Sequence, residues 1–324
     1  LDSVTNQPIA GAVYEVYDKS GNLKETVTVN DKGQIILKDY VVTDYTLKEI
    51  EAPDGYLSNK DYSGAGKEFT LTNTDDNKLT ILYVKKGKII VHFAYQDGTA
   101  IETAGPITVT GGNGTVVNLK EQTEVKKQLA DLAAASTDYR FISFEKGQLT
   151  GTEEAAVIPY DSEEVYYKYE GLLSLTVPTL LNFERGFVSP FEQILSYDST
   201  TDFEVAIRDN RQITSTSATQ TAKTRGNLRL NANLSKEFTT TSNKVLKDAR
   251  LIYQDGTKQV VLNGMGGEIV NNQQTVTDPT KKDFTFVLNT AGNKSQGFKL
   301  EVPAKGTLAD VYTGEVTWEI VQEP

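Results

Sequence analysis

Residues 89–98 read Ile-Ile-Val-His-Phe-Ala-Tyr-Gln-Asp-Gly, a pattern typical of a β-strand that runs into a tight turn. Apolar side chains recur at every second position, and the Asp-Gly dipeptide that follows favours a hairpin turn. Successive side chains of a strand point to opposite faces, so Ile89, Val91 and Phe93 would line one face of a sheet. The stretch therefore predicts a half-buried strand.

The same alternation recurs along the chain, as in the sets Ala12, Tyr14, Val16; Phe203, Val205, Ile207; and Phe284, Phe286, Leu288. One stretch departs from it. Within residues 123–136, apolar side chains fall at helical spacing at Val125, Leu129, Leu132 and Ala133. This spacing predicts one short amphipathic helix lying on a sheet. We therefore expect a mainly β chain with a single helix.

Composition narrows the possible partners of the chain. A formal net charge of −11 repels nucleic acid and anionic membranes, so we expect neither as a partner. Cysteine is absent, which excludes disulfides, thiolate zinc sites and cysteine nucleophiles. The longest apolar run, residues 171–183, is interrupted by Pro178 and is too short to span a membrane. We expect no membrane insertion.

Breaks in the strand pattern divide the 324 residues into three predicted modules. Lys85-Lys86-Gly87-Lys88 closes the first, and Glu170-Gly171 closes the second. The predicted modules are residues 1–86, 87–170 and 171–324, each β-sandwich or β-grasp-like, with the helix in the middle one. Because the sequence opens at Leu1 within an apparent strand and without a signal peptide, we expect it to be a fragment of a longer polypeptide.

Residues 1–86 resemble the Cna-B, or prealbumin-like, module of Gram-positive adhesins and pilins. The matching segments are Leu1-Asp2-Ser3-Val4-Thr5-Asn6-Gln7-Pro8-Ile9-Ala10-Gly11-Ala12-Val13-Tyr14, Tyr45-Thr46-Leu47-Lys48-Glu49 and Ala52-Pro53-Asp54-Gly55-Tyr56. The resemblance implies a β stalk module on a cell surface.

Glu49 is unusual in this first module. It lies on the same strand face as Tyr45 and Leu47, so it faces the core if they do, and a buried carboxylate is costly unless it is paired or neutralised. The family resemblance implies a glutamate that promotes a Lys–Asn isopeptide bond. Here that lysine would precede Leu1, and Lys85 stands where asparagine is usual, after an expected last strand at residues 79–84. We expect no cross-link, and a glutamate that hydrogen-bonds locally or reaches the surface.

Residues 87–170 resemble a MucBP-type module, on Ile89 to Ile101 and on the closing strand Val165-Tyr166-Tyr167-Lys168-Tyr169. The resemblance implies a β-grasp-like stalk, a type sometimes credited with mucin or glycan binding. Tyr166 and Tyr167 could stack on sugar rings, although packing within the module is the simpler interpretation. The single histidine, His92, has no histidine or cysteine partner for a zinc site, which favours a structural or surface role.

Residues 171–324 resemble the WxL domain of Gram-positive cell walls. The match comprises Tyr312-Thr313-Gly314-Glu315-Val316-Thr317-Trp318-Glu319-Ile320, with isoleucine in place of leucine, and the region of Asp209-Asn210-Arg211, Gly226-Asn227-Leu228-Arg229-Leu230-Asn231-Ala232 and Phe238. Leu228 stands where tryptophan is expected, so the ligand contacts of this first motif are in doubt. The resemblance implies non-covalent attachment to peptidoglycan or to a membrane-anchored WxL-interacting protein.

The residues with which the C-terminal module would bind are Trp318, Ile320, Leu228 and Leu230. Trp318 and Ile320 share one strand face, and Leu228 and Leu230 share another. These two pairs could pack together in a core. Alternatively, they could form an exposed apolar patch that grips a protein or stacks on glycan. Core packing is the simpler interpretation of a lone tryptophan on a closing strand.

Motifs for enzymatic chemistry are missing from the sequence. It contains no HExxH, P-loop, nucleophile elbow or dinucleotide fingerprint, and residues 264–268 have the composition of a tight loop. The acidic clusters at residues 73–77 and 198–202 lack the EF-hand register, so solvated turns are expected there. No catalytic residue, metal or cofactor is predicted. The expected function is surface attachment and display; the alternatives are a wall-active glycan hydrolase and an adhesin for host glycan, mucin or extracellular matrix.

Overall fold

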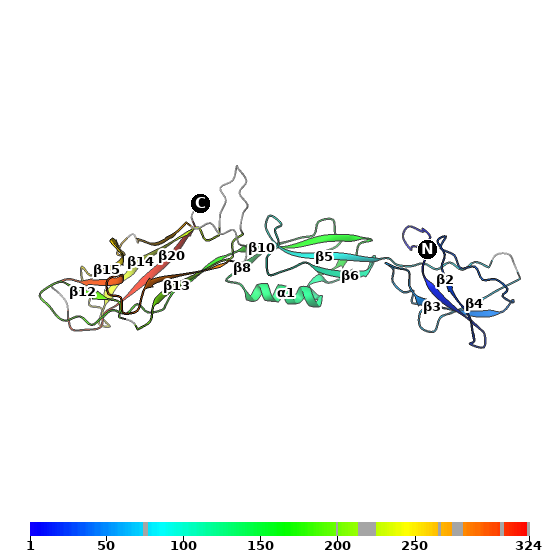
Figure 1. Cartoon of the computed structure of the whole chain (residues 1–324), viewed down its shortest axis with the longest axis horizontal. Helices are drawn as coiled ribbons and strands as arrows, with labels where there is room; N and C mark the ends of the chain where they lie inside the picture. Colours follow the sequence, from blue (N-terminus) through cyan, green and yellow to red (C-terminus); the bar gives the residue numbers. More distant parts are fainter. Residues whose placement is uncertain are drawn as a thin grey trace, which may run out of the picture. The chain divides into compact units, whose positions relative to one another are not determined.

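The structure is a computed structural model that describes residues 1–73, 77–198, 200–212, 225–264, 267–273, 281–304 and 308–322. Within these residues it is mainly β, with strands β1 to β20, one α-helix and one short 3-10 helix, which confirms the predicted fold class (Figure 1). The chain forms two compact units: unit 1 comprises Leu1–Asp131 and Ile142–Lys168, and unit 2 comprises Leu132–Phe141 and Tyr169–Pro324. The division into three modules stays a prediction.

The first sheet of unit 1 is antiparallel, and its strands lie in the order β2 (Leu23–Thr28), β1 (Val13–Asp18), β3 (Asp44–Glu51) and β4 (Lys67–Thr70). The alternation seen in the sequence sets its buried face, which carries Tyr14 and Val16 from β1 and Tyr45 and Leu47 from β3. Residues 79–84, expected to be a strand, contribute only an isolated bridge between Tyr83 and Asp2. That expectation was wrong, although Tyr83 does enter the core.

The second sheet contains the strand predicted from residues 89–98. Its strands lie in the order β6 (Ile107–Gly112), β5 (Lys86–Tyr95), β10 (Ser162–Gly171) and β8 (Tyr139–Glu145), and a small ladder pairs β7 (Val116–Val117) with β9 (Ala156–Val157). Ile89, Val91 and Phe93 of β5 are buried, as predicted. The ring of Phe93 stacks on that of Tyr167 from β10, with 5.5 Å between their centroids.

The predicted helix is present as α1 (Thr123–Ala134), preceded by the 3-10 helix η1 (Leu119–Glu121). Val125 and Leu132 are buried and Leu129 is half-buried, so the apolar stripe packs against the protein, whereas Ala133 is exposed. No helix among the described residues is long and apolar enough to cross a membrane.

Unit 2 contains three sheets. The strands of the first sheet lie in the order β11 (Leu173–Thr176), β13 (Phe203–Asp209) and β18 (Asp283–Asn289). Those of the second sheet lie in the order β12 (Gln193–Ser196), β19 (Gly297–Val302), β15 (Arg250–Asp255) and β16 (Lys258–Val261). Those of the third sheet lie in the order β17 (Gly267–Asn272), β14 (Leu228–Thr239) and β20 (Thr313–Gln322). All the strand pairs with a defined register are antiparallel.

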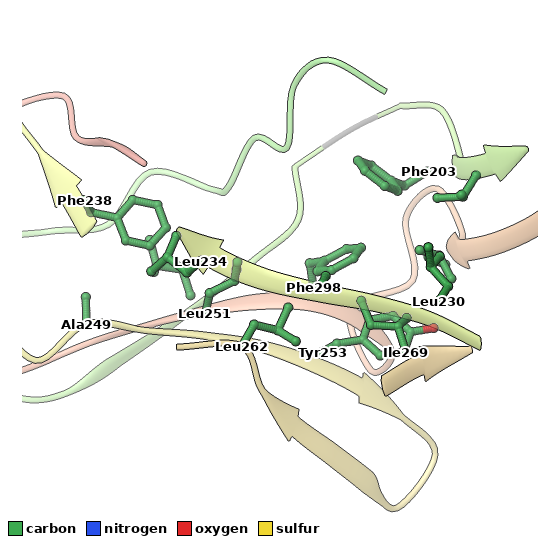
Figure 2. Packing of buried hydrophobic residues seen from close by; sticks show 14 of the residues in the cluster. Phe203, Leu230, Leu234, Phe238, Ala249, Leu251, Tyr253, Leu262, Ile269 and Phe298 are labelled. Atoms are coloured by element: carbon green, nitrogen blue, oxygen red, sulfur yellow. The ribbon is translucent and has the colours of Figure 1, made fainter. Parts of the chain in front are cut away.

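One hydrophobic core joins the three sheets of unit 2. Figure 2 shows side chains from different sheets converging on it, among them Phe203 of β13, Leu230 of β14 and Phe298 of β19. The rings of Phe203 and Phe298 meet at a steep angle with 5.2 Å between their centroids, an edge-to-face geometry that aromatic pairs favour. The strands of unit 2 therefore enclose a packed sandwich-like interior.

Candidate functional site

The strands that carry the two motif regions of the WxL resemblance are direct neighbours in the structure. β14 pairs antiparallel with β20, which places Leu230 opposite Ile320, Leu228 opposite Gln322 and Ala232 opposite Trp318. Two segments that are distant along the chain thus share one ladder.

Burial differs among the four candidate binding residues. Leu228 and Leu230 are 0% exposed, whereas Trp318 and Ile320 are half-buried and pack against the same core. The Trp318 ring stacks on Phe203, with 5.9 Å between centroids, and meets Phe298 edge-on at 6.0 Å. This arrangement favours core packing over a surface patch for the two leucines. Ligand binding by Trp318 and Ile320 stays a prediction.

A cavity of about 970 Å³ lies against Trp318. It is lined by residues 177–188 and 308–316 and by core residues such as Phe203, Leu251 and Trp318. We call this cavity the β20 groove, because the second of these segments contains the first part of that strand. Several apolar residues that line it are exposed to solvent, namely Leu180, Phe187, Val188, Leu308 and Val311.

So many exposed apolar side chains around one cavity set the β20 groove apart from ordinary surface. Phe187, for example, is 82% exposed. Single apolar residues are common on protein surfaces, but a contiguous patch bordering a groove marks an interaction site. The groove was not predicted from the sequence, because the exposed apolar residues of the segment 177–188 show no strand periodicity.

Charged residues at the rim of the β20 groove are mostly acidic: Glu184, Asp310 and Glu315, against one Arg185. Glu184 pairs with Lys294, and this ammonium group holds the pKa of the Glu184 carboxyl below its ordinary value. Glu315 pairs with Lys236 at 2.9 Å. Of the three acidic residues that line the groove, Glu184 and Glu315 are therefore paired with lysines that lie outside its lining.

An ionic clamp occupies the region of the first WxL-like motif. The Asp209 carboxylate accepts hydrogen bonds from the Arg211 guanidinium at 2.6 and 2.8 Å and from the backbone N–H of Gly226 at 2.8 Å. Arg225 is fully buried, and its Nε donates to the Arg211 carbonyl at 2.9 Å. These bonds tie together the two chain segments that flank residues 213–224, which lie outside the described residues. The region has a structural role that spacing alone did not reveal.

Glu49 is buried in unit 1, at 5% exposure, as its shared face with Tyr45 and Leu47 predicted. Its carboxylate accepts hydrogen bonds from the Ser58 hydroxyl, from the Asn59 backbone N–H and, at 2.9 Å, from the Tyr83 hydroxyl. Tyr83 also shares a hydrogen bond with Tyr14, and burial raises the pKa of Tyr14 to about 12. The carboxylate is thus satisfied by local donors, and the absence of a cross-link stays a prediction.

A second buried carboxylate, Asp2, was not predicted from the sequence. One oxygen accepts the backbone N–H groups of Val4 and Thr5 at 2.8 and 2.7 Å, and the other accepts the hydroxyls of Tyr56 and Tyr160 at 3.0 and 2.7 Å. Burial alone would raise the pKa of Asp2, but these four donors outweigh it and hold the pKa well below its ordinary value. Asp2 and Tyr160 lie 158 residues apart, so only the fold brings them together.

In the middle part of the chain, the rings of Tyr166 and Tyr167 both pack against other rings. Tyr167 is buried, and Tyr166 stacks on His92 with 4.7 Å between ring centroids. His92 lies 3.7 Å from Glu164. Among the described residues there is no group of three or more histidine, cysteine, aspartate or glutamate side chains placed to hold a metal. The acidic clusters at residues 73–77 and 198–202 lie in part outside those residues.

Comparison with known proteins confirms the resemblance of the N-terminal part to a prealbumin-like domain. Residues 1–63 match the family model of the SpaA prealbumin-like fold domain, which agrees with the Cna-B resemblance. The trypsin-resistant surface T6 protein of Streptococcus pyogenes serotype M6 is 33% identical over 93 residues, covering 25% of this chain and 17% of that protein. The chain therefore spans well under two thirds of this relative. The N-terminal part of the chain is therefore a prealbumin-like domain.

Two solved structures align along most of the chain with low similarity. The Bacillus anthracis TIE protein has a TM-score of 0.28 and 13% identity, over 96% of this chain and 46% of its own. BcpA, the major pilin subunit of Bacillus cereus, has a TM-score of 0.18 and 12% identity, over 97% and 64%. Neither similarity supports a conclusion about residues 87–324, so their MucBP and WxL resemblances stay predictions.

Proposed function

We propose that the chain is part of a Gram-positive cell-surface attachment and display protein. In this proposal residues 171–324 attach non-covalently to peptidoglycan or to a membrane-anchored WxL-interacting protein. The preceding modules serve as a stalk or adhesin, and no chemical reaction is catalysed.

The β20 groove is the observation that carries the attachment proposal. It joins a cavity of about 970 Å³ to exposed apolar residues such as Phe187 and Val311. Surfaces of this kind bury aromatic and aliphatic anchors at protein interfaces. A surface location is supported by the prealbumin-like domain and by the relationship to the T6 surface protein. These two relationships do not extend to the MucBP and WxL resemblances of residues 87–324.

Co-sedimentation of the full-length chain with purified cell walls, with and without extracted membrane proteins, tests this proposal. Phe187→Ser and Val311→Ser remove apolar rim residues without entering the core, and we expect them to lower the sedimented fraction at least fivefold. Val41→Ser is the matched control, because Val41 is similarly exposed but lies in unit 1. Equal binding by all variants would refute attachment through the groove.

A saccharide-release assay on the same walls separates attachment from hydrolysis. Attachment predicts sedimentation with intact wall and no soluble sugar, whereas release of sugar supports the hydrolase alternative. Binding to mucin or matrix protein that is insensitive to Phe187→Ser would instead favour an adhesin role for residues 1–170.

A further inference from the structure

We infer that Asp2 is the centre of a rigid junction within unit 1, which fixes the prealbumin-like domain to the sheet that contains β5 and prevents the two from bending against each other. The inference deepens the stalk role in the proposed function and rests on that proposal for its biological purpose. The junction involves residues of unit 1 alone, so it can be tested without any cell-wall ligand.

The first step is the segment 84–88, through which the chain passes from the core of the first sheet into β5. Towards the prealbumin-like domain, its backbone forms hydrogen bonds of 2.8 and 2.9 Å with the backbone of Gly55 and Leu57. Towards the other side, it forms hydrogen bonds of 2.9 and 3.0 Å with the backbone of Asn113 and Asp161. Domains move when an exposed linker without such bonds connects them. This segment is instead held from both sides.

The second step is the Asp2 carboxylate, which is 1% exposed. Three of the four donors described above for it lie in the prealbumin-like domain, namely Val4, Thr5 and Tyr56. The fourth is the Tyr160 hydroxyl at 2.7 Å, from the other side of segment 84–88. Opening the junction would take this donor away from a buried charged oxygen, and hydrogen bonds to charged groups are stronger than neutral ones. The burial of Asp2 therefore favours the closed junction.

The third step is Lys85, which holds the ring of Tyr160. Its ammonium group lies over that ring, 4.2 Å from the centroid, and pairs with the Asp161 carboxylate. The cation fixes the ring through its face, while Asp2 accepts its hydroxyl. Because the side chain of Asp161 is 73% exposed, its ion pair contributes little by itself. The junction thus depends chiefly on the bond between Asp2 and Tyr160.

Two tyrosine variants provide a matched test. Tyr56→Phe and Tyr160→Phe each remove one hydroxyl from the same oxygen of Asp2, but only Tyr160→Phe removes a contact across the junction. The chain contains no cysteine, so Ser20→Cys and Gln148→Cys, both at exposed positions, can carry spin labels on either side of the junction. Pulsed electron paramagnetic resonance on the full-length chain then measures the distribution of distances between the two labels.

We expect one narrow distance distribution for the doubly labelled parent chain and one at least twice as wide for Tyr160→Phe. Tyr160→Ala, which also removes the ring beneath Lys85, should widen it further, whereas Tyr56→Phe should leave the width unchanged. Circular dichroism checks that each variant is folded. A wide distribution in the parent chain, or equal widths for Tyr56→Phe and Tyr160→Phe, would overturn the inference.

Trypsin gives a second readout, because the segment 84–88 contains three lysines. When reclosing is fast, the cleavage rate follows the population of the open form. We expect Tyr160→Phe to speed cleavage after Lys85 and Lys86 at least tenfold, with cleavage after exposed Lys32 as the internal reference. If the junction is mobile but the chain still sediments with cell walls, only the rigid junction fails. If the junction is rigid and sedimentation is absent, only the attachment proposal fails.

Discussion

Unit 1 contains two buried carboxylates, those of Glu49 and Asp2. Glu49 and Asp2 are both almost inaccessible to solvent, and each is surrounded by hydroxyl and backbone N–H donors. Transferring a carboxylate into a β core costs several kcal/mol unless such donors replace the lost water. The hydrogen-bonding partners that the structure describes for these two carboxylates include neither lysine nor arginine. Removing single donors should therefore produce measurable losses of stability.

Tyr83→Phe should destabilise unit 1. The substitution keeps the ring in the core but takes away the hydroxyl that donates to Glu49, leaving a buried carboxylate oxygen short of a partner. We expect the free energy of unfolding to fall by about 1–3 kcal/mol. Urea unfolding measures the change. Tyr166→Phe is the control, because its hydroxyl bonds Glu164 at an exposed position, and it should cost under about 0.5 kcal/mol.

Lowering the pH should reduce the free energy of unfolding of unit 1, because Asp2 becomes protonated. The folded-state pKa of Asp2 is depressed below its unfolded value of 3.8, so the unfolded chain takes up the proton first as pH falls. The stabilising contribution of Asp2 is therefore complete well above pH 4 and is lost as the pH drops below about 4 towards its folded pKa. Chemical unfolding at several pH values measures the slope. Asp2→Asn should be less stable near neutral pH and should show a shallower acid dependence; an unchanged slope would contradict this account.

At the residue scale, the alternation of apolar residues predicted which face of a sheet a side chain points to, but not which residues it contacts. It placed Glu49 in the core together with Tyr45 and Leu47, because the alternation of side chains is a local property of a strand. It could not name Tyr83 or Ser58 as donors, and it overlooked Asp2 altogether. The pairing of Asp2 with Tyr160 depends on contacts between distant parts of the chain, which no local pattern encodes.

Among the secondary-structure elements, β14 and β20 show what a motif can indicate. Two short segments that resemble one family turned out to be adjacent strands, although sequence alone left open whether they packed together or formed a surface patch. In the structure Leu228 and Leu230 are buried, which favours packing for these two residues. Trp318 shares that core and also borders the β20 groove, a combination that becomes visible only when residues 177–188 are placed beside it.

Close packing around β5 yields a prediction at the element scale. A Cβ added to Gly87 would overlap the carbonyl oxygen of Pro159, a backbone atom that cannot turn aside. Gly87→Ala should thus displace the backbone and cost about 1–3 kcal/mol. Gly105→Ala is the control, since nothing lies within 4 Å of its added Cβ. Thermal unfolding of both variants checks the difference; equal melting temperatures would contradict the packing described for β5.

On the scale of the whole molecule, two compact units predict two unfolding transitions. Each unit has its own hydrophobic core, and chains with separable cores depart from two-state unfolding. Calorimetry should resolve two transitions. Gly87→Ala should lower only the transition of unit 1. Trp318→Ala, which removes an indole packed on Phe203, should lower only that of unit 2, by the equivalent of about 3 kcal/mol. A single transition that shifts with both variants would rule out independent cores.

The whole-molecule description was only partly accessible from sequence. The mainly β class and the single helix followed from periodicity, which is repeated many times along the chain. The grouping of residues 132–141 with unit 2 did not, because it depends on contacts made by side chains such as Tyr139, whose hydroxyl accepts a hydrogen bond from Lys282 at 2.7 Å. Register breaks along the chain do not show such long-range packing.

The pairing of β14 with β20 also sets the order of events during synthesis. A ribosome releases β14 first, and the strand that completes its sheet follows only after residues 240–312 have emerged. Until then, the apolar side of β14 and the ring of Phe203 lack their covering tryptophan. Nascent unit 2 should therefore remain incompletely folded until β20 appears, which makes its folding depend on contacts between distant parts of the chain.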